Sequence, residues 1–191
     1  MTDADQTRIT QLLDRLGEQP GAMARLSELV YQDIHRLAHY QRFEMRAGET
    51  LRTTALVHEA FLKIFRDGSA DPDIEDRQHL MRLMGRVIRQ IIVDHARRKL
   101  AEKRGAGAQH EPIDDQSLMD TSEREAAGVL DMESALERLE RIDPDLADTV
   151  SARFFAGYTA DEIASIKSIS RRTVYRDLQR ATAWLRLDMG G

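Results

Sequence analysis

The stretch TADEIASIKSISRRTVYRDLQRATAWLR, residues 159–186, decides the fold of the C-terminal half. Thr159 and Glu162 have the spacing of a capping box, in which each side chain accepts a hydrogen bond from the backbone amide of the other residue. Ser170 is a second N-cap candidate, because apolar residues follow it at helical spacing. That apolar stripe consists of Val174, Leu178, Ala181 and Leu185. We therefore predict two short helices joined by a tight turn.

The second predicted helix carries cations and polar side chains on the faces that its apolar stripe leaves open. This arrangement is typical of a DNA-reading helix-turn-helix, whose second helix contacts base edges with its first residues. The candidate DNA-binding residues are Arg171, Arg172, Thr173, Tyr175 and Arg176 for bases, and Arg180 for phosphate. The alternative interpretation is an ordinary exposed helix with solvated arginines.

Charge is distributed unevenly along the chain. Its 28 Lys and Arg against 33 Asp and Glu give a net charge of −5, which argues against coating nucleic acid through bulk charge. A second basic stretch nevertheless occupies residues 86–104, where Asp94 and Glu102 are the only acids. Acidic residues are concentrated between positions 111 and 148. Two separated basic elements suggest two contacts with one DNA molecule.

Helical periodicity dominates the rest of the chain, which has only four prolines, so we predict an all-α protein. The expected helices span about 5–16, 22–45, 53–65, 76–103 and 123–141, with another beginning at Asp143-Pro144 and ending near 155–157. Residues 105–122 are rich in Gly, Asp, Gln and Ser and predict a flexible acidic linker. We expect one helical domain over 1–104 and a four-helix domain with the helix-turn-helix over 123–191.

Several classes of protein are disfavoured by composition. No apolar run approaches a membrane span, and no secretory signal is visible at the N-terminus, so we expect a cytoplasmic protein without membrane contact. Cysteine is absent, which excludes disulfides and thiol nucleophiles. His35 and His39 lie one helical turn apart but lack an evident third ligand. We predict no catalytic residues, no metal site and no cofactor.

Three further segments are ALVHEAFLKIF at 55–65, HLMRLMGRVIRQIIVDHARRK at 79–99 and IDPDLADTVSARFFAGYTADEIASIKSISRRTVYRDLQRA at 142–181. Together, in this order, they resemble a sigma factor of the extracytoplasmic-function (ECF) type within the sigma-70 family. The first is similar to the region that grips the polymerase clamp, the second to the helix that opens and reads the minus-10 element, and the third to the minus-35-binding domain. The resemblance implies a subunit that directs core RNA polymerase to specific promoter DNA and is not itself an enzyme.

The resemblance also implies roles for particular residues. The candidates for contact with the promoter strands are Arg86, Arg89, Gln90, Asp94, His95, Arg97 and Arg98, and the loop over 67–78 would capture an unstacked base. The candidates for polymerase binding are Leu56, Glu59 and Lys63. The alternative for the arginines is that they only solvate a helix end.

The chain departs from the family pattern where an acidic tetrad commonly precedes the clamp-binding stretch. The aligned residues here are Arg52, Thr53, Thr54 and Ala55. A phosphothreonine would restore negative charge at a helix N-terminus, so a Ser/Thr kinase acting on Thr53 or Thr54 is one hypothesis for control. The alternative is that either threonine merely caps the helix. An anti-sigma factor is a further possible partner.

A second departure is Lys167-Ser168 in the turn of the helix-turn-helix, where the family often has Leu-Gly. Serine, unlike glycine, is strained at positive φ, so we expect a turn that is either slightly strained or differently shaped. The alternative function is a helix-turn-helix transcriptional regulator that is not a polymerase subunit and has a signal-receiving N-terminal half. Such receivers are usually α/β, and the N-terminal half lacks strand-like runs.

Overall fold

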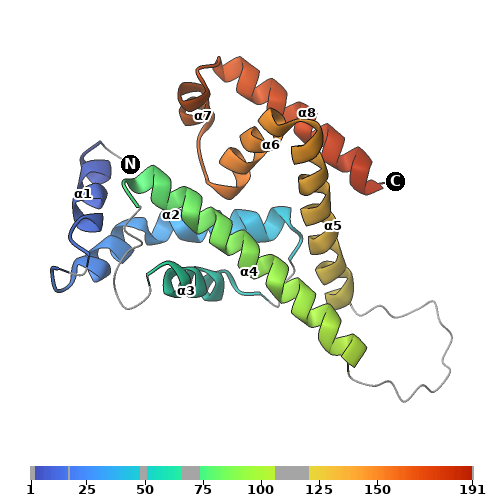
Figure 1. The fold of residues 1–191 in the computed structure, drawn as a ribbon, viewed down its shortest axis with the longest axis horizontal. Helices are drawn as coiled ribbons and strands as arrows, with labels where there is room; N and C mark the ends of the chain where they lie inside the picture. Colours follow the sequence, from blue (N-terminus) through green and yellow to red (C-terminus); the bar gives the residue numbers. More distant parts are fainter. Residues whose placement is uncertain (1–2, 17, 48–50, 66–73, 106–120, 191) are drawn as a thin grey trace.

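The computed structural model describes residues 3–16, 18–47, 51–65, 74–105 and 121–190. These parts of the chain are helical and contain no strand, which confirms the predicted all-α class (Figure 1). In chain order the elements are α1 (Asp3–Leu13), α2 (Ala22–Glu44), α3 (Thr53–Ile64), α4 (Arg77–Gly105), α5 (Thr121–Ile142), α6 (Pro144–Val150), the π-helical turn η2 (Ser151–Phe155), α7 (Ala160–Lys167) and α8 (Arg171–Gly190). No described helix is long and apolar enough to cross a membrane.

The observed helix boundaries lie within a few residues of those predicted, with one exception. The segment expected to form one helix from Asp143 to about residue 157 begins as predicted, because the Asp143 side chain accepts a hydrogen bond from the Leu146 amide at 3.0 Å. It then changes from α-helix to the π-helical turn η2, in which the Ala156 amide bonds the Ser151 carbonyl at 2.9 Å. Most of the predicted linker lies outside the described residues.

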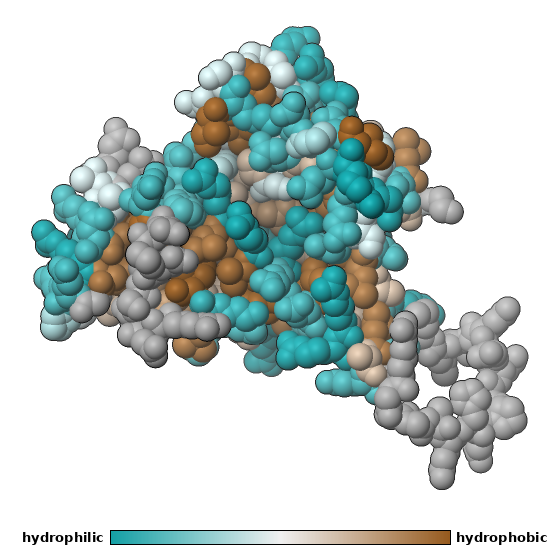
Figure 2. Space-filling model, in the orientation of Figure 1, coloured by the Kyte–Doolittle hydropathy of each residue, from teal (hydrophilic) through white to brown (hydrophobic). Residues whose placement is uncertain are grey.

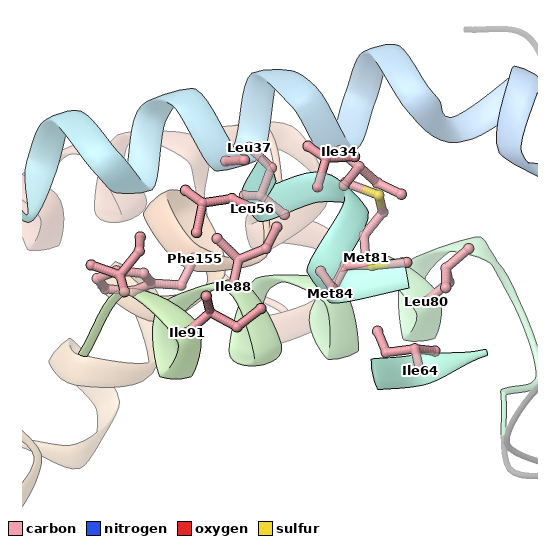
Figure 3. Close-up of a cluster of buried hydrophobic side chains, with 14 of the residues drawn as sticks. Ile34, Leu37, Leu56, Ile64, Leu80, Met81, Met84, Ile88, Ile91 and Phe155 are labelled. Carbon is pink, nitrogen blue, oxygen red and sulfur yellow. The ribbon is translucent and has the colours of Figure 1, made fainter. Parts of the chain in front are cut away.

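In the N-terminal half, α2 and α4 pack against each other, α1 packs mainly on α2, and α3 packs on both α2 and α4. Figure 3 shows the centre of this core, where Ile34 and Leu37 of α2 meet Met84 and Ile88 of α4. The start of α4 is tied to α2 by an ion pair between Arg77 and Asp33, with 2.6 Å between nitrogen and oxygen. Burial alone would raise the pKa of Asp33, but hydrogen bonds from Arg77 and Arg36 outweigh it, so this pKa is lowered.

The first helix of the C-terminal half, α5, lies along the last turns of α4 (Figure 1). Ala126 and Val129 of α5 belong to the same buried cluster as Ile92 and Ala96 of α4. Phe155 of η2 joins this cluster too, beside α4 in Figure 3. One hydrophobic core thus runs through both halves of the chain. The division into two domains at 104 and 123 stays a prediction.

Candidate nucleic-acid interface

The helix-turn-helix has the local geometry that its sequence predicts. The Glu162 amide donates to the Thr159 hydroxyl at 3.2 Å and the Thr159 amide donates to the Glu162 carboxylate at 2.7 Å, which confirms the capping box. The Thr173 amide donates to the Ser170 hydroxyl at 3.1 Å, so Ser170 is the second cap. Ser168 has φ 54° and ψ 40°, the left-handed region in which a serine is strained, as expected.

A small separate core holds the two helices of this motif together. It consists of Ala156, Tyr158, Ala160, Ile163 and Val174. Burial raises the pKa of Tyr158, so its hydroxyl keeps its proton at neutral pH. Because Val174 and Ala181 are fully buried, the opposite faces of α8 are left for contact with a ligand.

The predicted base-reading side chains of α8 lie on that open side. Arg171, Arg172, Tyr175, Arg176 and Arg180 are exposed, and Thr173 is half-buried. The Arg171 guanidinium lies 5.6 Å from the centre of the Tyr175 ring. Arg180 makes long ion pairs with Asp143 and Asp177, at 3.5 and 3.6 Å. The Arg180 side chain is 58% exposed, whereas those of Asp143 and Asp177 are 33% and 18% exposed, so a phosphate would compete with both carboxylates for this guanidinium. Figure 2 shows one face of the molecule, on which hydrophilic residues are interspersed with apolar patches.

The second predicted DNA-contacting surface lies on α4. Arg86, Gln90, Arg97 and Arg98 are exposed, whereas Arg89, Asp94 and His95 are half-buried. Burial and the nearby charges of Lys99 and Arg98 lower the pKa of His95, against the opposing effect of Glu102 and Glu59. His95 is therefore neutral at physiological pH and adds hydrogen-bonding capacity rather than charge to this surface.

Arg89 differs from the other predicted residues of α4, because it is held between the two halves of the chain. Its Nε lies 2.7 Å from a carboxylate oxygen of Glu133 on α5, and the two side chains are only 22% and 19% exposed. Its guanidinium also lies 4.8 Å from the centre of the Phe155 ring. In this arrangement the Arg89 guanidinium is engaged by intramolecular partners from the C-terminal half.

A cavity of about 390 Å³ opens beside Arg89, between α4 and the C-terminal half. Its cationic lining consists of Arg82, Arg86, Arg89 and Lys167, and its acids are Glu140 and Asp148. Sequence reasoning missed Arg82, although its spacing of four residues from Arg86 places both on one helical face. Lys167 was also missed as a lining residue; it is held by the Asp145 carbonyl at 2.8 Å and by Asp148 at 3.1 Å.

The predicted polymerase-binding residues of α3 fall into two groups. Leu56 is 1% exposed and packs in the core beneath α3. In this arrangement its side chain is therefore not available for contact with another protein. Glu59 and Lys63 lie on the outer face, where their charged atoms are 3.8 Å apart. Leu62, which sequence reasoning did not select, is the exposed apolar residue between them.

The first turn of α3 contains the two threonines predicted as phosphorylation sites. The N-cap position is occupied by Arg52, which makes no side-chain cap hydrogen bond, and the turn has no acidic residue. Thr53 and Thr54 are thus the first two residues of the helix rather than its cap, with Thr54 exposed and Thr53 half-buried. The loop predicted to capture a base lies mostly outside the described residues.

Within the described ranges, no group of three or more His, Asp or Glu side chains is placed to hold a metal ion. The two histidines noted on α2 are engaged with aromatic rings. His35 lies 5.7 Å from the Tyr31 ring, and His39 stacks on Tyr40 at 6.2 Å between ring centres.

Comparison with known protein families agrees with this geometry. The family model described as ECF sigma factor matches residues 6–190, which include α3, α4 and the helix-turn-helix. No curated protein and no solved structure gave a significant match. Members of the matched family bind core RNA polymerase and promoter DNA and regulate the initiation of transcription; they are not enzymes. A match over nearly the whole length, on a fold with two exposed cationic helices, means that the chain belongs to the ECF sigma factor family.

Proposed function

We propose that this sigma factor binds core RNA polymerase through the outer face of α3 and selects its promoters with α4 and α8. The exposure of the α8 arginines, on faces away from the fully buried Val174 and Ala181, is the observation that carries the proposal. In this assignment Arg171, Arg172, Thr173, Tyr175 and Arg176 read the minus-35 element, and Arg180 binds phosphate. The α4 residues from Arg86 to Arg98 contact the melted minus-10 strands.

The outer face of α3 supports a polymerase contact that combines one apolar residue with two charges. Leu62 supplies an exposed apolar side chain, and Glu59 and Lys63 flank it one turn apart. Since Glu59 and Lys63 compensate each other, this face carries little net charge. A contact with basic polymerase surface would therefore be weak without additional negative charge nearby.

Phosphorylation of Thr53 or Thr54 by a Ser/Thr kinase is our proposal for the source of that charge. A phosphate brings about −1.5 to −2 charges at pH 7 and would stand at the positive end of the α3 dipole. Because Arg52 occupies the N-cap position, neither threonine serves as the helix cap. Phosphorylation would therefore not remove a capping hydrogen bond. The exposure of Thr54 favours it as the first site. Control by an anti-sigma factor is the alternative.

The test is run-off transcription and co-purification with core polymerase, using the wild type, Thr53→Ala/Thr54→Ala and Thr53→Asp/Thr54→Asp. We expect the Asp variant to bind polymerase more tightly than the Ala variant. Thr121→Asp is the matched control, because Thr121 is an exposed first residue of another helix, α5. Equal polymerase binding by all variants would refute the proposed activation by phosphorylation, but it would not contradict the sigma function. Duplex DNA binding with no polymerase binding would instead favour an independent regulator.

A further inference from the structure

The lining of the cavity beside Arg89 has two chemically different parts. From α4 come Arg82, Arg86 and Arg89, whose spacing of four and three residues places them on one face of the helix. From α6 and α7 come four apolar residues, Pro144, Ala147, Ile163 and Ile166. The volume of about 390 Å³ is that of a site for one small molecule. The cavity is therefore shaped and charged for a ligand that is anionic at one end and apolar at the other.

Two of the cations in this lining are already paired with carboxylates. Arg89 is held by Glu133 at 2.7 Å, and Lys167 by Asp148 at 3.1 Å. These pairs are neutral overall and add little to the attraction of an anion.

The other two cations, Arg82 and Arg86, are free to bind a ligand. Both are exposed, and neither side chain makes an ion pair or a hydrogen bond within the part of the chain that the structure describes. The charge of Arg82 also acts on Tyr158, which lines the same cavity, where it opposes the rise in the tyrosine pKa that burial causes. Arg82 thus lies close to the C-terminal half, on the side of α4 that the cavity occupies.

The chemistry of the lining identifies the class of ligand. A terminal phosphate has three acceptor oxygens, enough for two guanidinium groups one helical turn apart, whereas the two oxygens of a carboxylate are matched by one guanidinium. The apolar residues suit a flat ring that leaves water. The exposed Glu140 carboxylate, also in the lining, can accept a hydrogen bond from an amino group on such a ring. A nucleoside monophosphate combines these features.

We propose that this cavity binds a free nucleoside monophosphate, with its phosphate on Arg82 and Arg86 and its base against Ile163 and Ile166. The site goes beyond promoter binding, because Arg82 and Ile166 have no part in the proposed function. A ligand there would contact α4 and α7 together.

The first test is isothermal titration calorimetry of the full-length chain with the 5′-monophosphates of adenosine, guanosine, cytidine and uridine. We expect at least one of them to bind. Its nucleoside and ribose 5-phosphate should each bind at least about tenfold more weakly, because each keeps only one part of the contacts. No binding by any of the four at about 1 mM overturns the proposal. A nucleoside or a sugar phosphate that binds as tightly as the nucleotide overturns it too.

The second test locates the ligand with Arg82→Gln, since Arg86 is also assigned to DNA. Arg82 has no ion pair or hydrogen bond to lose, so the fold should survive, and circular dichroism checks this. Arg124→Gln makes the same charge change at an exposed position of α5 outside the cavity. Arg82→Gln should weaken nucleotide binding at least about tenfold and Arg124→Gln should not change it. Equal affinities would place the ligand elsewhere and refute the site.

Ile166→Ser tests the apolar part of the lining independently of charge. Ile166 is 51% exposed, so the core does not depend on it, and Leu187→Ser is the control at an exposed position that does not line the cavity. Only Ile166→Ser should weaken nucleotide binding, by about fivefold. Equal effects of the two substitutions would contradict the placement of the base.

A single-stranded oligonucleotide without a terminal phosphate distinguishes a free nucleotide from a DNA strand. Arg82→Gln should leave its affinity nearly unchanged, because the cavity has room for one nucleotide and not for a strand. If Arg82→Gln weakens oligonucleotide and nucleotide binding equally, the cavity is part of the DNA interface and the proposal fails.

Discussion

The buried amide of Gln41 provides a sharp test of what holds the two halves together. Gln41→Met keeps the approximate size of the side chain but removes two hydrogen bonds from Nε2 to the carbonyl oxygens of Gly85 and Phe155, each with a net value of about 0.5–1.5 kcal/mol. The substitution also removes Gln41 Oε1, a buried atom without a hydrogen-bond partner, and this raises the free energy of unfolding by about 1 kcal/mol. The expected loss in the free energy of unfolding is therefore only about 1 kcal/mol.

Gln41→Glu should cost far more, although it is closer in shape. It replaces the donating NH₂ group by an oxygen that faces the carbonyls of Gly85 and Phe155, and it buries a charge without a partner. Uncompensated buried charges cost about 3–5 kcal/mol. The two substitutions should therefore differ by at least about 2 kcal/mol at pH 7. Gln32→Glu, at an exposed position of the same helix, is the control and should change stability by less than about 0.5 kcal/mol.

Urea unfolding followed by two probes measures these differences. Far-UV circular dichroism reports all helices, and the fluorescence of Trp184, the only tryptophan, reports the C-terminal half where it packs on the shared core. Because one hydrophobic cluster spans both halves, the two transitions of the wild type should coincide. A Glu variant as stable as the Met variant would refute the assigned role of the Gln41 amide.

Three further predictions concern the turn, the α2–α4 ion pair and the recognition helix. Ser168→Gly should raise the free energy of unfolding by about 0.5–1 kcal/mol, since glycine relieves the left-handed strain; thermal unfolding measures this, and a lower midpoint would contradict it. Asp33→Asn should cost about 1–3 kcal/mol at pH 7. Because the pKa of Asp33 is lowered from 3.8, its contribution is complete above pH 3.8 and is lost as the pH falls through the folded-state value. Urea unfolding at a series of pH values should thus show wild type and variant converging in acid, and a constant difference would argue against the pair. If Arg172 contacts a phosphate, Arg172→Ala should reduce the slope of log K against log salt for duplex binding by about 0.9. If Arg172 reads a base, the slope should stay the same and binding to the specific DNA sequence should weaken by about 1–3 kcal/mol. Anisotropy titration distinguishes the two outcomes, and no change of either kind would show that Arg172 does not contact the DNA.

The helix-turn-helix was predictable because its determinants are local. The capping box at Thr159, the cap at Ser170 and the apolar stripe after it are all fixed by spacing within a few residues. The strain at Ser168, which has φ 54°, was expected from the family resemblance, because a glycine often occupies this turn in the family. Short-range hydrogen bonding and helical periodicity decide such features before any tertiary contact forms.

The docking of the two halves was not predictable in the same way. Gln41 and Phe155 are 114 residues apart, and their contact uses a backbone carbonyl that leaves no side-chain pattern. In the sequence Arg89 looks like its neighbour Arg86, yet the structure pairs only Arg89 with Glu133. Leu56 was a candidate for polymerase contact, and only the packing of α3 shows that its side chain is buried. These features depend on how helices meet, which periodicity alone does not specify.

The π-helical turn at Ser151–Phe155 also affects how the chain tolerates a change in its length. Its wider ring, closed between Ser151 and Ala156, accommodates one residue more than an α-helical turn would. Deleting a single residue there closes the ring to an ordinary α-helical turn, so the segments that follow keep nearly their present direction. A deletion within α6, which has no such wide ring, would instead rotate η2 by about 100° around the helix axis and shift it by about 1.5 Å. The orientation of α7 and α8 is thus far less sensitive to a lost residue in η2 than to one lost in the helix before it.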